Sequence, residues 1–125
     1  MAFSKDNKFG AVIQNILDEL PSVIAVAIVD TNTGMTLASH SNNPSVNPDS
    51  AAAYNAEVVK QKQKAMAALK LSNESLDDIL ITLTNQIHLI KLLNGNKFIY
   101  LSANSRETNL AIAREVLRDQ ANLLN

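Results

Sequence analysis

The stretch at positions 79–103, ILITLTNQIHLIKLLNGNKFIYLSA, predicts three consecutive strands of an antiparallel sheet. Its first part, ILITLT (79–84), alternates large aliphatic residues with a second set that is partly Thr, which is typical of an edge strand with one better-buried face. IHLIKLL (87–93) follows, and the hairpin signal NGN (94–96) joins it to KFIYLSA (97–103). The last of these is apolar on both faces, which predicts a strand inside a sheet that helices cover on both sides.

Two more strands are predicted nearer the N-terminus. VIAVAIV (23–29) is apolar on both faces and too short for a typical helix, so it is a second central strand. MTLASH (35–40) is weaker and more polar. The five strands are numbered along the chain, and we expect hairpins to join strand 1 to 2, strand 3 to 4 and strand 4 to 5. If the two most apolar strands, 1 and 5, lie side by side, the sheet order is 2-1-5-4-3 with the weaker strands at the edges.

Two helical segments flank the first strand pair. Positions 9–20 carry apolar residues with helical spacing, and Pro21 ends that helix. The second helix is predicted over 48–71, which is roughly 35 Å at the usual rise per residue. Asn47 fits its N-cap, and Pro48 and Asp49 suit its first turn.

A third helix is predicted at the C-terminus. Asn104 or Ser105 would cap it, and Glu107 would close a capping box with Asn104. Its buried stripe comprises Leu110, Ala113, Leu117, Ala121 and Leu124. The element order is therefore α-β-β-α-β-β-β-α, which predicts an α/β chain of the α+β type with a five-stranded antiparallel sheet.

Composition limits the classes of function. The 125 residues are 46% hydrophobic and 18% charged with a net charge of −1, as expected of one globular domain over 1–125 without a general attraction to nucleic acid or membranes. The chain has no Cys, so disulfides, thiol nucleophiles and zinc ribbons are excluded. MAFSKDNKFG (1–10) carries charges where a signal peptide needs an apolar centre, and we expect a soluble, cytoplasmic protein without membrane insertion.

The segment DTNTG (30–34) places Asp30, Asn32 and Gly34 at alternating positions, like the first half of a calcium loop. The twelfth position of such a loop must be Glu, but here it is Ser41. We therefore expect a turn between two strands with Gly34 at positive φ, not a metal or catalytic site.

No other motif predicts chemistry. His40 and His88 are the only histidines, and they lack the spacing of a metal site. The sequence also lacks the G-x-S-x-G, G-x-x-x-x-G-K-[ST] and G-x-G-x-x-G motifs. We expect no cofactor, no metal and no enzymatic activity of the chain's own.

The sequence resembles the Roadblock/dynein light chain family, including its bacterial MglB-like members. The resemblance lies in two segments and in the long Ala-rich helix between them; the segments are VIAVAIVDTNTGMTLAS (23–39) and DDILITLTNQIHLIKLLNGNKFIYLSANSRETNLAIAREVL (77–117). The resemblance implies that the long helix covers one face of the sheet and the terminal helices the other. It also implies a homodimer in which the third strands join and the long helices pack antiparallel. The interface residues would be Tyr54, Val58, Ala65, Leu69, Ile81, Thr82 and Thr84.

The function that the resemblance implies is non-enzymatic regulation of a Ras-like small GTPase by a homodimer, including GTPase activation without catalytic residues of its own. In VVKQKQKAMAALK (58–70), Lys60, Lys62 and Lys64 either form a solvated surface or contact an acidic partner such as the GTPase. Arg106 is either an arginine finger or a structural residue, and the structural role is favoured.

Three other functions remain open. One is a light-chain-like scaffold subunit of a larger complex. Another is a profilin-like ligand-sensing domain, although the apolar central strands argue against a large cavity. The third is a metal-dependent enzyme, which would require Asp30 or His88.

Overall fold

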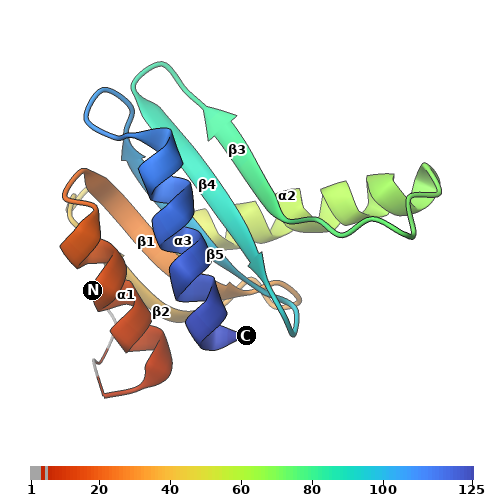
Figure 1. Cartoon of the computed structure of the whole chain (residues 1–125), viewed down its shortest axis with the longest axis horizontal. Helices are drawn as coiled ribbons and strands as arrows, with labels where there is room; N and C mark the ends of the chain where they lie inside the picture. The colour runs from red at the N-terminus through yellow and green to blue at the C-terminus, as the bar shows by residue number, and fades with distance from the viewer. Residues whose placement is uncertain (1–3, 5) are drawn as a thin grey trace.

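The computed structural model describes Ser4 and residues 6–125. They form an α+β fold whose antiparallel sheet has the order β2-β1-β5-β4-β3 (Figure 1). The elements are α1 (Lys8–Glu19), β1 (Val23–Asp30), β2 (Thr36–Ser41), α2 (Pro48–Ala68), β3 (Asp78–Thr82), β4 (Gln86–Leu93), β5 (Lys97–Asn104) and α3 (Leu110–Leu124). The predicted element and strand orders are both confirmed. Residues 1–3 and 5, on which the expectation about a signal peptide partly rests, lie outside the described residues.

The two apolar strands lie at the centre of the sheet, as predicted. Ile28 of β1 is opposite Ile99 of β5, and Val26 is opposite Leu101. All four side chains are fully buried. All four lie on the face that α1 and α3 cover, while α2 covers the opposite face (Figure 1).

Each face of the sheet has its own apolar cluster. On the α1/α3 face the largest buried members are Ile13, Ile16, Val26, Ile28, Leu89, Ile99, Leu101 and Leu117. On the α2 face the buried members are Ala27, Val29, Ala52, Ala56, Val59, Ile90, Phe98 and Tyr100. The helix side chains of the second cluster are small, so α2 approaches the sheet closely but buries little apolar area of its own.

The DTNTG segment is the turn between β1 and β2. The Asp30 carboxylate accepts hydrogen bonds from the backbone N–H groups of Asn32 (2.9 Å) and Thr33 (3.1 Å). The Asp30 carbonyl accepts the N–H of Gly34, which has φ +75°. A Cβ at position 34 would also lie 3.4 Å from the Cα of Ala53 in α2, so the prediction of a turn with a left-handed glycine is confirmed.

The start of α2 is as predicted, and its end is three residues earlier. The Asn47 side chain caps the helix by accepting from the N–H groups of Asp49 and Ser50. The helix ends at Ala68 because Lys70 adopts φ 59° and the N–H of Leu71 bonds to the carbonyl of Met66. This is a Schellman ending with Lys in place of the usual Gly. No helix within the described ranges is both long and apolar enough to span a membrane.

Three sequence predictions are wrong in detail. Thr84 is not in the edge strand, because Leu83 donates its N–H to the Gln86 carbonyl and the chain bends there after β3 ends at Thr82. The side chains of β3 are mostly half-buried on both faces, so neither face is the better buried.

The N-cap of α3 is the third. Asn109 caps the helix, since its side chain accepts the N–H of Ile112. The candidate Asn104 instead ends β5, and its side chain accepts the N–H of Arg106 in the following turn.

Candidate functional site

The second half of α2 projects beyond the sheet. Within the helix, the last buried residue is Val59. We call residues 60–69, comprising the rest of the helix and its C-cap, the α2 tail. Figure 1 shows this tail extending past β3, from which residues 70–77 return to the sheet edge. The α2 tail therefore has no hydrophobic core of its own chain beneath it.

Most of the predicted interface residues on α2 are exposed. Tyr54 is 77% exposed, Leu69 66% and Val58 37%, while Ala65 is half-buried. The spacing of these residues along the helix differs in phase from that of the residues that pack on the sheet. The exposed apolar side chains therefore form a separate face of α2. A large Tyr and a Leu left in water on one helix are unusual enough to indicate an interaction surface.

β3 is an edge strand with an unpaired side. The N–H of Leu92 bonds to the Asp77 carbonyl, and the N–H of Leu83 bonds to the Gln86 carbonyl, so odd-numbered residues of this segment face β4. The alternation of an antiparallel ladder then directs the backbone groups of Asp78, Leu80 and Thr82 away from the sheet. These groups are available to pair with another strand.

Beside that edge, part of the sheet face is open on the α2 side. Ile81 is opposite His88, and both side chains are half-buried. The His88 ring meets the Tyr100 ring edge-on with centroids 5.5 Å apart, and its Nε2 lies 2.9 Å from Oε1 of Gln86. Burial lowers the pKa of His88 below its ordinary value, so the neutral ring is favoured.

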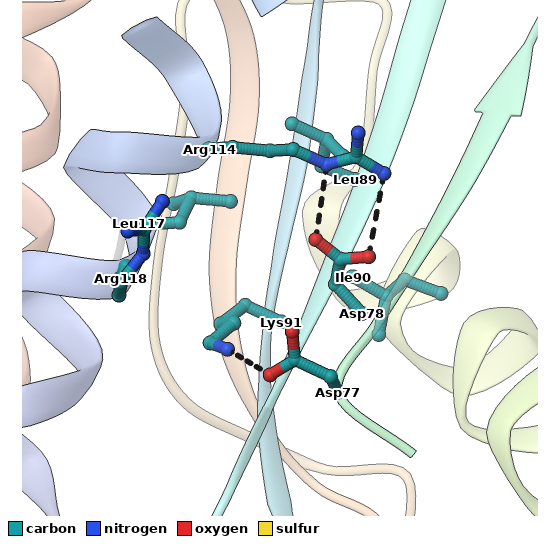
Figure 2. Close-up of a pocket in the computed structure, with 8 residues that line it drawn as sticks. All are labelled: Asp77, Asp78, Leu89, Ile90, Lys91, Arg114, Leu117 and Arg118. Carbon is teal, nitrogen blue, oxygen red and sulfur yellow. Dashed lines mark hydrogen bonds and ion pairs between the residues drawn. The ribbon is translucent and has the colours of Figure 1, made fainter. Parts of the chain in front are cut away.

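A charged cleft of about 300 Å³ lies where α3 faces the start of β3 (Figure 2). Arg114 binds the Asp78 carboxylate through Nε (3.0 Å) and an Nη (3.4 Å), and Lys91 binds Asp77. The Lys91 ammonium holds the pKa of the largely exposed Asp77 carboxyl below its usual range, and Arg118 adds a weaker effect of the same sign. This cleft is not visible in the sequence, because Asp78 and Arg114 are 36 positions apart and belong to no motif.

A second cavity, of about 620 Å³, adjoins the charged cleft and lies beside the α2 tail. Its lining includes Asp77, Lys91 and Arg118 of the charged cleft. We call it the tail groove. Its apolar lining comes from the α2 tail, the segment after it, the end of β4 and α3, namely Met66, Ala67, Leu71, Leu76, Leu92, Leu93 and Ala121.

No protein-family model matches the chain, and no curated protein matches its sequence. Its fold, however, matches solved structures closely. Myxococcus xanthus MglB is 20% identical, with a TM-score of 0.78 over 97% of this chain and 94% of that one. A Roadblock/LC7 domain from Streptomyces avermitilis is 12% identical, with a TM-score of 0.78 over 90% of each chain. MglB in a tetrameric arrangement is 16% identical, with a TM-score of 0.79 over 98% of this chain and 91% of that one.

The chain has the Roadblock/LC7 fold. This agrees with the resemblance seen in the sequence, since the match covers both terminal helices as well as the sheet. At these identities the likeness establishes the Roadblock fold alone.

Within this Roadblock fold, the lysines of α2 lie on the α2 tail. Lys60 is half-buried and forms an ion pair with Glu57 at 3.4 Å. Lys62 and Lys64 are exposed. The structure thus places all three predicted partner-binding residues on the segment that projects from the sheet.

The candidate residues for a metal site, His40, His88 and Asp30, are dispersed. His40 lies on β2 and His88 on β4, with β1 and β5 between them. Asp30 is engaged in its own turn. Among residues 4 and 6–125, no three His, Asp or Glu side chains are grouped so that they could hold a metal ion. Arg106 is exposed in the turn before α3.

Proposed function

We propose that the chain is a homodimeric, non-enzymatic regulator that binds a Ras-like small GTPase and modulates its nucleotide cycle. The observation that carries this proposal is the α2 tail projecting past an unpaired β3 edge. Both features are costly in a monomer, and a second copy of the chain related by a two-fold axis compensates for both at once.

The α2 tail needs a surface to pack on. At ten residues, or about 15 Å, it is shorter than the helices that are stable alone in water. In a dimer joined at β3, the two α2 helices run antiparallel, and each tail extends over the open sheet face of the other copy. Tyr54, Val58, Ala65 and Leu69 then face the second copy, together with Ile81 on the sheet.

The β3 edge determines the register of the pair. If the two-fold axis passes beside Leu80, this residue pairs with Leu80 of the second copy, and Asp78 pairs with its Thr82. Every outward-facing residue of β3 is then used in three hydrogen-bonded pairs, each of which exchanges two bonds. Any other register leaves one of these residues without a partner. Thr84 lies beyond the strand, so we assign it no part in the strand pairing.

The dimer would present two lysine-bearing α2 tails. Lys62 and Lys64 are exposed, and an acidic surface on the GTPase would complement them. The resemblance to MglB-like proteins supports a GTPase as the partner. Regulation would follow from differential binding: if the dimer prefers one conformation of the GTPase switch loops, it shifts the GTPase toward that conformation without contributing catalytic groups.

This proposal is tested with purified Ras-like small GTPases from the genome that encodes this chain. Binding and single-turnover GTP hydrolysis are measured with the wild-type chain, with the Lys62→Glu/Lys64→Glu variant and, as a control, with Lys8→Glu on α1. We expect the wild type and the control to bind and change the hydrolysis rate, and the double variant to bind at least tenfold more weakly. Absence of binding by the wild type contradicts the proposal.

The scaffold alternative is distinguished in the same experiment. A scaffold subunit would bind its partner with unchanged GTP turnover, and the purified chain would recover a larger assembly in a pull-down. The exposed α2 tail also fits that role, so turnover is the deciding measurement.

A further inference from the structure

We propose that the tail groove is a receptor for the β3–β4 turn of a second copy, with Leu83 as the inserted side chain. This inference rests on the proposed dimer and goes beyond it. It assigns a ligand to a cavity that a single copy leaves open, and it makes the pair selective for copies of the same chain.

Leu83 is an exposed apolar side chain at the end of the interface strand. It is 49% exposed. Its N–H bonds to Gln86, so it continues the alternation of Ile79 and Ile81, and its side chain lies on the α2 face of the sheet. A single copy therefore leaves about half of this apolar side chain in water, next to the polar turn residues Thr84 and Asn85.

The register of the β3 pair places this side chain at the tail groove. With Leu80 paired to Leu80 of the second copy, residue numbers on opposite strands sum to 160. Leu83 of the second copy therefore lies opposite Asp77, and its Thr84 lies opposite Leu76. Asp77 and Leu76 both line the tail groove.

The groove lies between the α2 tail and α3, and its wall on the α2 side is on the same side of the sheet as Leu83 of the second copy. Leu76 packs against the apolar cluster of the α2 face. The groove wall on that side is formed by Met66 and Ala67 of the α2 tail. An α2-face leucine arriving opposite Asp77 therefore meets Leu76 and Met66, which are both only half-buried in one copy.

Charge and size suit this occupant. The turn residues Leu83, Thr84 and Asn85 are uncharged, so insertion brings no unpaired charge beside Asp77 and Lys91. The groove volume of about 620 Å³ can hold the whole turn and not only one side chain. By the two-fold symmetry, each copy inserts Leu83 once and receives it once, so the contact is made twice in every dimer.

The consequence is selectivity for the chain's own copies. Strand pairing uses backbone groups, which every chain with this fold can offer. The insertion depends instead on side chains, namely Leu83 in the turn that inserts and Met66, Leu71 and Leu76 in the groove that receives it. A chain with a charged residue in this turn would pair poorly, because the charge would be buried in the groove.

The first test compares two exposed leucines at opposite edges of the sheet. Leu83→Asp is measured against Leu37→Asp on β2, where Leu37 is 40% exposed. Sedimentation velocity over a concentration series gives the dimer dissociation constant. We expect Leu83→Asp to weaken the dimer at least tenfold and Leu37→Asp to leave it unchanged. Equal dissociation constants for Leu83→Asp and the wild type overturn the inference.

The second test uses the natural absence of cysteine. Chains carrying Met66→Cys are mixed with chains carrying Leu83→Cys under mild oxidation, and the control mixture pairs Leu37→Cys with Leu83→Cys. We expect a disulfide-linked dimer from the first mixture only.

The outcomes separate this inference from the proposed dimer. If the wild type dimerises and Leu80→Cys forms a covalent dimer, but the mixture of Met66→Cys and Leu83→Cys gives no disulfide, the dimer is retained and the receptor role of the groove is rejected. A wild-type chain that remains monomeric at millimolar concentration rejects both.

Discussion

At the scale of single residues, a few side chains hold the chain in conformations that the rest of the molecule requires. Asp30 and Gly34 form the β1–β2 turn, and the lack of a side chain at Gly34 allows α2 to pass close to it. Lys70, in contrast, has a side chain at a position where glycine would be favoured. It adopts a left-handed conformation that favours glycine, at the end of a helix with little packing of its own.

Replacing Lys70 with Gly should stabilise the protein. A residue with a Cβ at φ 59° destabilises the folded chain by about 1–2 kcal/mol, which Gly would remove. Gly also gives the unfolded chain more conformational freedom, which offsets about 0.4–1 kcal/mol of this gain in stability. We expect the free energy of unfolding to rise by about 0.5–1 kcal/mol in Lys70→Gly, measured by urea denaturation at one protein concentration. The matched variant Lys64→Gly, in the helix interior, should lose about 1 kcal/mol. A loss in both variants would show that the end of α2 is not strained.

His88 should make stability depend on pH. Burial lowers its pKa in the folded chain below the value of about 6.5 expected when unfolded, so the unfolded chain takes up the proton first as the pH falls. The free energy of unfolding should therefore decrease as the pH falls below about 6.5, and the loss should level off below the folded-state pKa. Denaturation of the wild type and His88→Gln between pH 7.5 and 5 measures this. A slope that persists unchanged in His88→Gln assigns it to another group.

At the scale of elements, the periodicity of apolar residues was enough to locate every helix and strand and the order of the sheet. The ends of elements were harder to predict. NSRETN (104–109) offers several side chains that can cap a helix, and the choice of Asn109 depends on the turn that Asn104 forms after β5. ILITLT continues to alternate past the end of β3, because Leu83 follows the ladder even though Thr84 bends away.

The charged cleft could not be predicted for a different reason. Its ion pairs join β3 or the residue before it to β4 and α3, and each side chain alone resembles an ordinary surface charge. Only the strand order and the position of α3 bring Asp78 to Arg114. The α2 helix lies between these cases, since its Tyr54 and Leu69 were visible in the sequence but the projection of the α2 tail past the sheet was not.

Proline substitutions on β3 should separate dimerisation from folding. The N–H of Thr82 faces away from β4, so Thr82→Pro removes a donor from the free edge without breaking the sheet. The N–H of Ile81 faces β4, so Ile81→Pro removes a bond within the sheet. We expect Thr82→Pro to be folded and monomeric, and Ile81→Pro to be strongly destabilised, by circular dichroism and sedimentation. A dimeric Thr82→Pro would show that β3 is not the interface.

At the scale of the whole molecule, the projecting α2 tail and the edge strand β3 lie at the same side of the sheet (Figure 1). The α2 tail extends past β3, and the tail groove lies between this tail, the segment after it, the end of β4 and the C-terminal half of α3. A monomer would leave a helix segment, a strand edge and three exposed leucines, Leu69, Leu71 and Leu83, in water at this side of the sheet. One two-fold axis beside Leu80 accounts for all of them.

A single cysteine can locate that axis. In the proposed register, Leu80 and its copy form a hydrogen-bonded pair with Cα atoms about 5.5 Å apart, which is within the range of about 4.4–6.8 Å found in disulfides. Leu80→Cys should therefore form a covalent dimer under mild oxidation. Ile79→Cys is the matched control. In the proposed register Ile79 lies opposite Ile81 of the second copy, so the two cysteines of this variant would be two positions apart along the paired strands. Cross-linking of Ile79→Cys in preference to Leu80→Cys would move the axis by one residue, and Leu83 would then no longer lie opposite Asp77.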